Sequence, residues 1–325
     1  MSKVAVIGAT TWGNTLGRLL AEKGVVVKVW ARTEAKAEEL RQEHHSTKCL
    51  SYTGNLGEAL HAVEFVICAV PAQRMRQNLK LSNPHLNASV ILISVAKGLE
   101  AETGKRMSEV IAEEAASVSQ DKICALSGPN LSGEINQGLP ATSVIAGRDM
   151  KVAKKVQRLL DSPNFSVFVS DDIVGVELCG ALKNVIALGA GIMDGLELGN
   201  NAKAAFITLG WNEVISLGMS LGAKPSTFYG LAGLGDLIAT GNSSLSRNHY
   251  VGYELGKGRP LNDIITAMPN VAEGVDTAIA AHRLAKGLSL ETPIINLVYS
   301  MLFESLPPAE ISRRFKNGLK PESIL

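Results

Sequence analysis

The order of the apolar runs along the chain is the feature that most constrains its fold. Over residues 1–170, short runs typical of buried strands alternate with stretches whose apolar residues recur at helical spacing. Strands that alternate with helices predict βαβ units, right-handed crossovers and a mostly parallel sheet. The expected strands are residues 3–8, 25–30, 65–70, 89–94, 123–126, 142–146 and 165–169, with helices over 13–23 and 34–43.

After about residue 170 the strand-like runs stop, and helical patterns fill the rest of the chain. These patterns cover residues 174–188, 202–219, 264–284 and 293–304, with breaks at glycine-rich or proline-containing segments. The sequence therefore predicts an α/β, Rossmann-like, doubly wound domain over residues 1–170, followed by an all-helical domain over residues 171–325. A length of 325 residues fits two domains.

The charge balance excludes several classes of function. The chain has 32 Lys and Arg against 31 Asp and Glu, a net charge of +1. This balance argues against a nucleic-acid partner and against attraction to an anionic membrane.

The longest apolar stretch, residues 173–193, contains Glu177, Lys183 and Asn184, which are costly in lipid. We expect a buried helix of a soluble protein, with no membrane insertion.

The N-terminus and the cysteines favour a cytoplasmic location. Residues 1–3 lead directly into the first expected strand, which leaves no room for a signal peptide. No cysteine belongs to a C-x-x-C pair or has a histidine at metal-ligand spacing, so we expect reduced thiols and no metal site. The cysteines are Cys49, Cys68, Cys124 and Cys179.

A glycine-bounded loop, Gly8-Ala-Thr-Thr-Trp-Gly13, separates the first expected strand from the first helix. Gly8 permits a tight turn, Gly13 lets helix and strand pack closely, and the helix N-terminus offers N–H groups to a pyrophosphate. Thr10 replaces the middle glycine of the usual dinucleotide pattern. The context favours a nucleotide site, and an ordinary strand-to-helix turn is the alternative.

The end of the second expected strand bears on the choice of cofactor. It reads Trp30-Ala-Arg-Thr33, with no carboxylate for the ribose hydroxyls of NAD. Arg32 could instead pair with a 2′-phosphate. This favours NADP(H) over NAD(H), with a solvated Arg32 as the alternative.

Further polar groups follow two later strands. Lys97 and the turn Ser127-Gly-Pro-Asn130 are expected at the carboxyl edge of the sheet, where ligands bind in open α/β folds. Lys97 there could reach a substrate or a nicotinamide, unless it is an exposed loop residue. Gly128 and Asn130 could present N–H and amide groups to a polar ligand.

Lys183 is the most informative residue, because it interrupts the apolar helix of residues 174–188. Lysine seldom enters such a run without a partner or a function. Burial lowers a lysine pKa, as an acid or base near neutral pH requires. The alternative is a structural lysine paired with Glu177 or Asp194.

Two later segments complete the candidate site. Asp236 follows a glycine-rich turn and could orient Lys183 or bind a substrate hydroxyl. Ser246, Arg247 and Asn248 offer hydroxyl, guanidinium and amide groups within one short stretch, which suits a phosphate or carboxylate. Together they indicate a small anionic substrate.

In this order along the chain, these motifs resemble those of glycerol-3-phosphate dehydrogenases. The resemblance rests on Gly8–Gly13, Val-Ala-Lys97-Gly-Leu-Glu, Ser127-Gly-Pro, Gly180-Ala-Leu-Lys-Asn184, Gly-Leu-Gly-Asp236, Ser-Arg-Asn248 and Glu273. It implies an NAD(P)+-dependent oxidoreductase that interconverts sn-glycerol 3-phosphate and dihydroxyacetone phosphate. In bacterial-type members, the reduction feeds phospholipid synthesis.

The resemblance also implies roles for individual residues. Lys183 would exchange the proton at the substrate C2 oxygen, and Lys97 would contact both cofactor and substrate. The implied substrate contacts are Lys97, Gly128, Asn130, Lys183, Asp236, Ser246, Arg247 and Asn248. The implied cofactor contacts are Gly8, Thr11, Trp12, Gly13, Arg32, Lys97, Ser132, Arg247, Val271 and Glu273. Asn130 and Ser132 stand where family members more often have Ser or Thr and Ala.

Two other functions remain open at this point, and a homodimer is open as well. A β-hydroxyacid dehydrogenase would share the sheet, the helical domain and a helix lysine. That family places an asparagine four residues after the lysine, where this chain has Ala187. A nucleotide-sensing module without catalysis is the second alternative.

Overall fold

The computed structural model describes residues 2–43, 49–241, 246–268 and 271–316. The chain forms two compact units. The first, which we call the sheet unit, consists of Met1–Ala96 and Arg106–Glu177. The second, the helical unit, consists of Lys97–Lys105 and Leu178–Leu325. The expected division at residues 170 and 171 stays a prediction.

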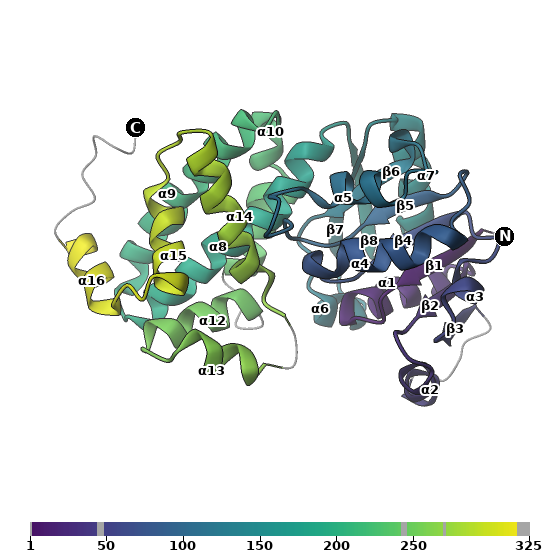
Figure 1. Cartoon of the computed structure of the whole chain (residues 1–325), viewed down its shortest axis with the longest axis horizontal. Helices are drawn as coiled ribbons and strands as arrows, with labels where there is room; N and C mark the ends of the chain where they lie inside the picture. Colours follow the sequence, from purple (N-terminus) through teal and green to yellow (C-terminus); the bar gives the residue numbers. More distant parts are fainter. Residues whose placement is uncertain (1, 44–48, 242–245, 269–270, 317–325) are drawn as a thin grey trace. The chain divides into compact units, whose positions relative to one another are not determined.

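An eight-stranded sheet forms the centre of the sheet unit (Figure 1). Its order is β3-β2-β1-β4-β5-β6-β7-β8, and every neighbouring pair is parallel except β6 and β7. The strands are β1 (Lys3–Ile7), β2 (Val26–Trp30), β3 (Leu50–Thr53), β4 (Phe65–Cys68), β5 (Ile91–Ser94), β6 (Ile123–Ser127), β7 (Ala141–Gly147) and β8 (Phe165–Ser170). This confirms the expected doubly wound, mostly parallel sheet.

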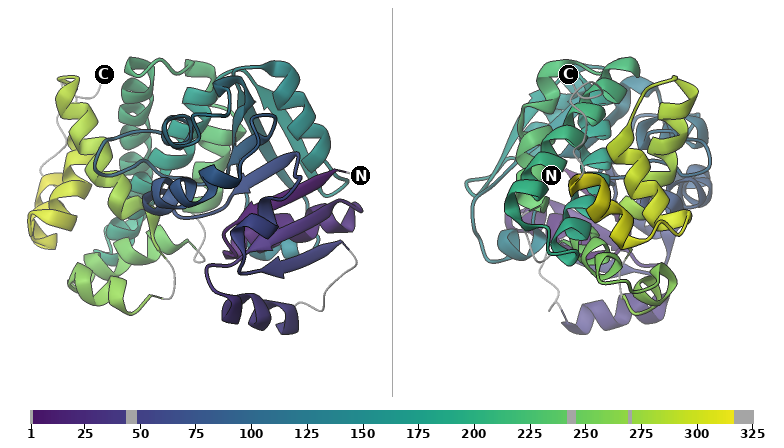
Figure 2. Two further views of the ribbon diagram at one scale, coloured as in Figure 1. Left: turned by 45° about the vertical axis from the view of Figure 1, so that its right-hand side comes forward. Right: turned by 90° about the vertical axis from the view of Figure 1, so that its left-hand side faces the viewer.

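Helices cover both faces of the sheet (Figures 1 and 2). One face packs against α1 (Thr11–Glu22), α2 (Glu34–Glu43), α6 (Ser132–Asn136) and α7 (Met150–Leu160). The other packs against α3 (Leu56–Leu60), α4 (Ala72–Ser82) and α5 (Met107–Glu114). Short 3₁₀ turns, η1 (Asn83–His85) and η2 (Gln120–Lys122), precede β5 and β6. The continuous apolar runs of β4, β5 and β6 are buried because helices cover both faces.

Strand β3 was not expected from the sequence. It is an edge strand of four residues, in which Ser51 is exposed while Leu50 and Tyr52 are buried. So short and half-polar a segment gives little periodic signal by itself, and pairing with β2 makes it a strand.

The helical unit contains most of α8 and all later helices (Figure 1). They are α8 (Ile173–Gly195), α9 (Gly199–Ser220), α10 (Pro225–Phe228), the π-helical turn η3 (Leu231–Gly235), α11 (Asp236–Gly241), α12 (Arg247–Gly256), α13 (Leu261–Thr266), α14 (Glu273–Gly287), α15 (Pro293–Phe303) and α16 (Pro308–Lys316). The helical pattern over residues 264–284 is divided between two helices in the structure. Its residues belong to α13 and α14, and residues 269–270 between them lie outside the described residues.

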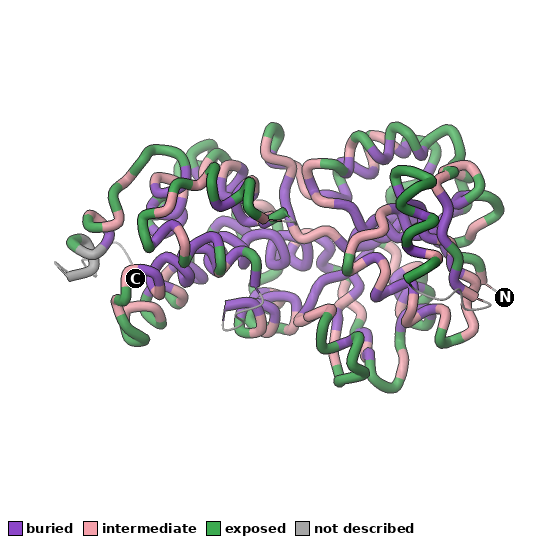
Figure 3. The backbone as a smooth tube through the Cα atoms, turned by 90° about the horizontal axis from the view of Figure 1, so that it is seen from below, coloured by how far each residue is buried: buried purple, intermediate pink, exposed green. Residues whose placement is uncertain are grey.

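Helix α8 is the core helix of the helical unit. Among the described residues it is the one helix long and apolar enough to cross a membrane, and 94% of its most apolar window is buried. Figure 3 shows the buried segments of each unit enclosed by exposed turns. This burial shows that the apolar stretch is part of the protein core.

A close crossing fixes α12 on α8. A Cβ on Gly191 of α8 would lie 2.1 Å from the carbonyl oxygen of His249, and one on Gly252 would lie 1.9 Å from that of Leu188. Only glycine permits backbones to approach so closely. The crossing places the start of α12 beside the helix that carries Lys183.

Candidate functional site

Two lysines and one aspartate form the centre of the candidate site in the helical unit. The Lys183 Nζ lies 2.5 Å from Asp236 Oδ1, and the Lys97 Nζ lies 2.8 Å from Asp236 Oδ2. Lys183 is 4% exposed and Asp236 is 2% exposed. One buried carboxylate therefore binds two ammonium groups, which compensates the cost of burying these charges.

The chain brings these groups together from three distant segments. Lys183 lies in α8, Lys97 in the segment after β5, and Asp236 at the first position of α11. The turn before Asp236 is tightly packed, because a Cβ on Gly233 would lie 2.3 Å from the carbonyl oxygen of Phe228. This packing explains the glycine-rich sequence that precedes the aspartate.

Asn184 and Thr240 orient the two lysines. The Asn184 amide donates a hydrogen bond of 2.8 Å to the backbone carbonyl of Lys97. The Thr240 hydroxyl accepts from Lys183 Nζ, and it lies 3.3 Å from Asp236 Oδ1. Thr240 was missed by sequence reasoning, although its spacing of one helical turn from Asp236 could have indicated it. Asn184 was noted beside Lys183 without a role.

Burial has the largest influence on the pKa of Lys183. Loss of solvation lowers its pKa to about 8, while Asp236 acts to raise the pKa and Lys97 to lower it. An ammonium with such a pKa can lose and regain its proton near physiological pH. The arrangement can therefore supply a proton to a substrate oxygen and recover it.

The two structural partners considered for Lys183 are engaged elsewhere. Glu177 accepts hydrogen bonds from Arg106 at 2.8 Å and from the Ser108 N–H at 2.7 Å. Asp194 binds Lys203 and His249, each at 2.8–2.9 Å. Asp236 is thus the ionic partner of Lys183, and it belongs to the candidate site itself.

The start of α12 provides a second part of the site. The Ser246 hydroxyl caps this helix by accepting from the N–H of His249, and the exposed Arg247 begins it. No other described residue forms a hydrogen bond or ion pair with the Arg247 guanidinium, so it is available to an anion. Asn248 is instead engaged, because its Oδ1 accepts from the Gly274 N–H at 2.9 Å.

Val271 and Glu273 lie at the start of α14. Val271 is 46% exposed, and Glu273 is the first residue of the helix. Gly274 packs against α8, because a Cβ there would lie 2.7 Å from the carbonyl oxygen of Asn184. The start of α14 therefore lies beside the residue that follows Lys183.

The loop Gly8–Gly13 in the sheet unit fits a dinucleotide pyrophosphate. Gly8 has a φ of +109°, and a Cβ on Gly13 would lie 2.2 Å from the carbonyl oxygen of Gly8. Thr10 caps α1, accepting from the Gly13 N–H at 3.1 Å and donating to the Ala69 carbonyl at 2.9 Å. The N–H groups of Thr11 and Trp12 in the first turn cannot bond within the helix. They are the donors that a pyrophosphate requires.

The remaining expected contacts also lie in the sheet unit. Arg32 is exposed, and its side chain binds no other residue that the structure describes. Gly128 has a φ of +149°, where a side chain would be strained. The Asn130 amide donates to Ser143 Oγ at 3.1 Å, and its buried Oδ1 has no protein partner among the described residues. Ser132 is the first residue of α6.

Two family models match the chain. The model described as "NAD-dependent glycerol-3-phosphate dehydrogenase N-terminus" matches residues 3–153. The model for the C-terminus of the same family matches residues 172–313. Together they cover both units.

Individual proteins agree with this match. The chain is 51% identical over 324 residues to a glycerol-3-phosphate dehydrogenase [NAD(P)+] of Dehalococcoides mccartyi, covering 97% of this chain and 90% of the relative. It is 41% identical to the same enzyme of Syntrophotalea carbinolica, covering 98% and 99%. The crystal structure of glycerol-3-phosphate dehydrogenase from Coxiella burnetii superposes with a TM-score of 0.92 at 31% identity, covering 98% of this chain and 99% of that one.

Proposed function

The chain belongs to the NAD-dependent glycerol-3-phosphate dehydrogenase family, and on this premise we propose how its residues carry out the reaction. The reaction interconverts dihydroxyacetone phosphate and glycerol 3-phosphate with an NAD(P) cofactor. Membership in the family sets aside both the β-hydroxyacid dehydrogenase and the non-catalytic sensor.

Lys183 is the proton donor in the direction of reduction. When bound, the reduced nicotinamide supplies a hydride to C2 of the ketone, and the oxygen on C2 gains negative charge. The Lys183 ammonium donates a proton to that oxygen, and in the opposite direction the neutral amine takes the proton back. The buried ion pair of Lys183 with Asp236 is the observation that carries this proposal.

Lys97 and Asp236 prepare the site for the developing charge. Lys97 stabilises the oxygen electrostatically, because it enters the same buried cluster as Lys183. Asp236 holds both lysines in position, and Asn184 fixes the backbone of Lys97. Positions set before the substrate arrives need no reorganisation during the reaction.

The start of α12 binds the phosphate of the substrate. Arg247 supplies a guanidinium without a protein partner among the described residues, and the first-turn N–H groups of α12 add donors. Ser246 and Asn248 shape this end of the helix through their hydrogen bonds. Gly128 and Asn130 remain proposed substrate contacts in the sheet unit.

The cofactor is held mainly by residues of the sheet unit, with NADPH preferred over NADH. Gly8, Thr11, Trp12 and Gly13 bind the pyrophosphate, and Arg32 binds the 2′-phosphate. The support for this preference is the Arg32 guanidinium two residues after β2, which is exposed and has no partner among the residues that the structure describes. Ser132, Val271 and Glu273 are further proposed cofactor contacts.

The assay follows absorbance at 340 nm with dihydroxyacetone phosphate, using NADPH and NADH in parallel. We expect oxidation of both cofactors, with a higher kcat/KM for NADPH, and no oxidation with dihydroxyacetone, which lacks the phosphate. An Arg32→Ala variant should lose the preference for NADPH. Equal kcat/KM values for the two cofactors in the wild-type enzyme would overturn the preference while leaving the reaction intact.

We further propose that the enzyme acts in the cytoplasm as a homodimer and feeds glycerophospholipid synthesis. Support for self-association comes from exposed apolar side chains on adjacent elements of the helical unit, namely Tyr229 at 65%, Leu234 at 37% and Ile238 at 55% exposure. Light scattering of the eluted protein should give twice the chain mass of 34.4 kDa, and Tyr229→Asp should reduce it. A monomeric wild-type protein would contradict the dimer.

A further inference from the structure

Glu34, the first residue of α2, is a carboxylate four residues after the end of β2. Glu34 follows Gly13 by 34 − 13 = 21 residues. In dinucleotide-binding folds, an acidic residue about 20 residues after the glycines binds the ribose hydroxyls and disfavours a 2′-phosphate. Glu34 is therefore at a position from which it could oppose NADPH, two residues after Arg32.

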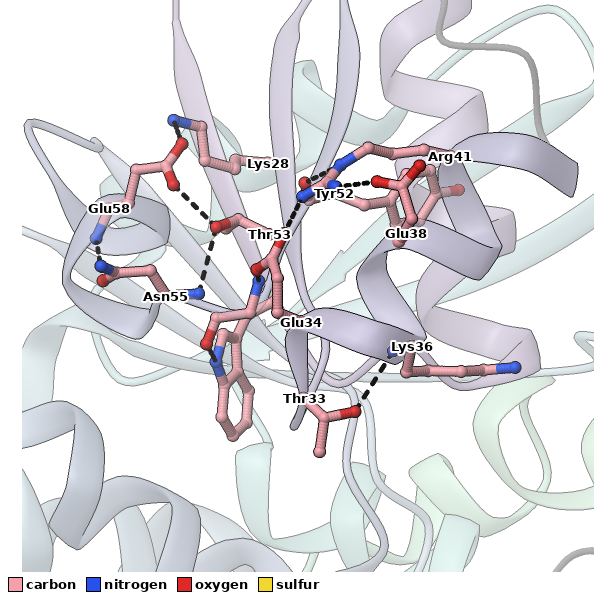
Figure 4. Close-up of polar contacts among 12 residues, drawn as sticks. Lys28, Thr33, Glu34, Lys36, Glu38, Arg41, Tyr52, Thr53, Asn55 and Glu58 are labelled. Atoms are coloured by element: carbon pink, nitrogen blue, oxygen red, sulfur yellow. Dashed lines mark hydrogen bonds and ion pairs between the residues drawn. The ribbon is translucent and has the colours of Figure 1, made fainter.

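The structure shows that both oxygens of Glu34 are occupied by protein donors (Figure 4). Its Oε2 accepts a hydrogen bond of 2.7 Å from the Gly54 N–H, and its Oε1 pairs with the Arg41 guanidinium. Both contacts lower the pKa of Glu34, the one with Arg41 more than the one with Gly54. The carboxylate stays ionised, and its charge is compensated within the protein.

Arg41 and Gly54 are themselves well fixed. Arg41 lies in the last turn of α2, donates from Nε to the Tyr52 carbonyl at 3.1 Å and also pairs with Glu38. A Cβ on Gly54 would lie 2.6 Å from the Glu34 nitrogen, so the loop after β3 packs directly on the start of α2. The Gly54 carbonyl accepts from the Trp30 indole at 3.1 Å. Figure 4 shows these contacts linking the ends of β2 and β3.

We propose that Arg41 is a specificity-determining residue for the cofactor, because its ion pair with Glu34 weakens the negative field of that carboxylate beside Arg32. Arg41 acts through Glu34 and does not bind the cofactor. This inference rests on the proposed role of Arg32 and adds a residue that the strand-end sequence alone does not identify.

The test measures binding of two cofactor fragments by calorimetry, without any turnover. Adenosine 2′,5′-bisphosphate contains the 2′-phosphate, and adenosine 5′-monophosphate lacks it. The readout is the ratio of their two Kd values. Arg41→Ala should shift this ratio against the bisphosphate by roughly two- to five-fold, the size of effect expected from one partly exposed ion pair.

A double-mutant cycle separates neutralisation of Glu34 from direct phosphate contact. Glu34→Gln alone should not disfavour the bisphosphate, and Glu34→Gln combined with Arg41→Ala should restore the wild-type ratio to within about two-fold. If Arg41 touches the phosphate, the double variant will bind the bisphosphate as weakly as Arg41→Ala does. That result would overturn the proposal.

Two further variants control for charge and folding. Lys36→Ala removes another cation of α2, one that pairs with Glu39, and should leave the ratio near the wild-type value. A loss as large as that of Arg41→Ala would instead indicate a general electrostatic effect and overturn the proposal. Arg41→Lys keeps a cation beside Glu34 and should retain the ratio, with thermal unfolding as a check on the fold.

Failure of this inference is distinguishable from failure of the proposed cofactor preference. The wild-type ratio and its loss in Arg32→Ala test the preference. The change from wild type to Arg41→Ala tests the inference, whatever the wild-type ratio is. A wild-type preference for the bisphosphate that Arg41→Ala leaves unchanged would refute only the role of Arg41.

Discussion

At the residue scale, Lys183 meets two requirements that oppose each other. As the proposed proton donor, its side chain must leave water to reach the reacting oxygen, and it must still carry a proton there. Burial lowers the pKa of Lys183 to about 8, and the Asp236 carboxylate keeps it from falling further. With this pKa, Lys183 is mainly an ammonium at neutral pH, and a small rise in pH converts it to the neutral amine.

Replacing Lys183 by alanine should remove the proton donor without emptying the phosphate site. We expect kcat to fall by roughly 10²–10⁴-fold, the usual scale of general acid–base catalysis. The KM for dihydroxyacetone phosphate should change far less, because Arg247 remains. Steady-state kinetics on the folded variant check this, and near-normal turnover would refute the assignment.

The pH dependence of the reaction should follow the Lys183 pKa of about 8. Reduction needs the ammonium, so its kcat should decline as the pH rises through 8, whereas oxidation needs the amine and should increase. Asp236→Asn removes the charge that raises this pKa, so the pH profiles of kcat for reduction and for oxidation should both move to lower pH. If the profiles of the variant match those of the wild type, a group other than Lys183 controls them.

At the scale of elements, the glycine-packed crossing of α8 and α12 fixes the proposed phosphate-binding helix against the helix that contains Lys183. Gly191 and Gly252 provide the closest approaches in this crossing. Any Cβ there must push the helices apart, because the neighbouring atoms are backbone. The site geometry thus depends on residues that touch no substrate.

Gly252→Ala should therefore destabilise the protein and raise the KM for dihydroxyacetone phosphate. Overpacking typically costs about 1–3 kcal/mol, and here the inserted Cβ meets backbone. Gly287→Ala is the matched control, since nothing lies within 4 Å of a Cβ at the end of α14. Thermal unfolding and kinetics of both variants test this, and equal Tm values would contradict it.

A second link between elements joins Glu213 of α9 to the start of α15. The Glu213 carboxylate accepts from the N–H groups of Ile294 and Ile295 at 2.7 and 2.9 Å. Burial nevertheless raises its pKa from 4.5 to about 7, and these two hydrogen bonds only partly oppose the shift. The carboxyl group therefore titrates in the folded protein near neutral pH.

This titration makes part of the stability depend on pH. Between pH 4.5 and about 7 the folded protein retains a proton on Glu213 that the unfolded chain releases. Stability from this group therefore falls as the pH rises through that window. Glu213→Gln should remove this component, so the Tm advantage of the wild type should shrink from pH 5 to pH 8. Parallel Tm curves for the two proteins would show that Glu213 does not titrate there.

At the scale of the whole molecule, the proposed function assigns most cofactor contacts to one unit and the proton donor and phosphate contacts to the other. The sheet unit contains the Gly8–Gly13 loop and Arg32, and the helical unit contains Lys97, Lys183 and the start of α12. Each ligand should therefore protect mainly the unit that supplies most of its proposed contacts.

Hydrogen exchange with single ligands tests this division. NADPH alone should slow exchange of the amides of Thr11 and Trp12, and glycerol 3-phosphate alone should slow it at Arg247 and Asn248. The reason is that bound phosphate oxygens would accept hydrogen bonds from these first-turn N–H groups. Protection of Thr11 and Trp12 by glycerol 3-phosphate, with none at Arg247 and Asn248, would reverse the assignment.

From the sequence alone, the fold class could be predicted, and the glycine-bounded loop and Lys183 could be selected as candidate site residues. Alternating apolar runs, a glycine-bounded turn and a lysine within an apolar helix are local patterns, and local patterns reflect backbone geometry and burial directly. The family resemblance then ordered the remaining motifs, and the matching family models confirm it.

Which groups meet depends on contacts between residues that are far apart in the sequence. Asp236 joins Lys183 and Lys97 across separations of 53 and 139 residues, so no local pattern could choose it over Glu177 or Asp194. The strand pairing of β3 and the compensation of Glu34 by Arg41 and Gly54 likewise depend on neighbours brought together by folding. Charge pairing and edge-strand formation depend on distance in space, which periodicity along the chain does not specify.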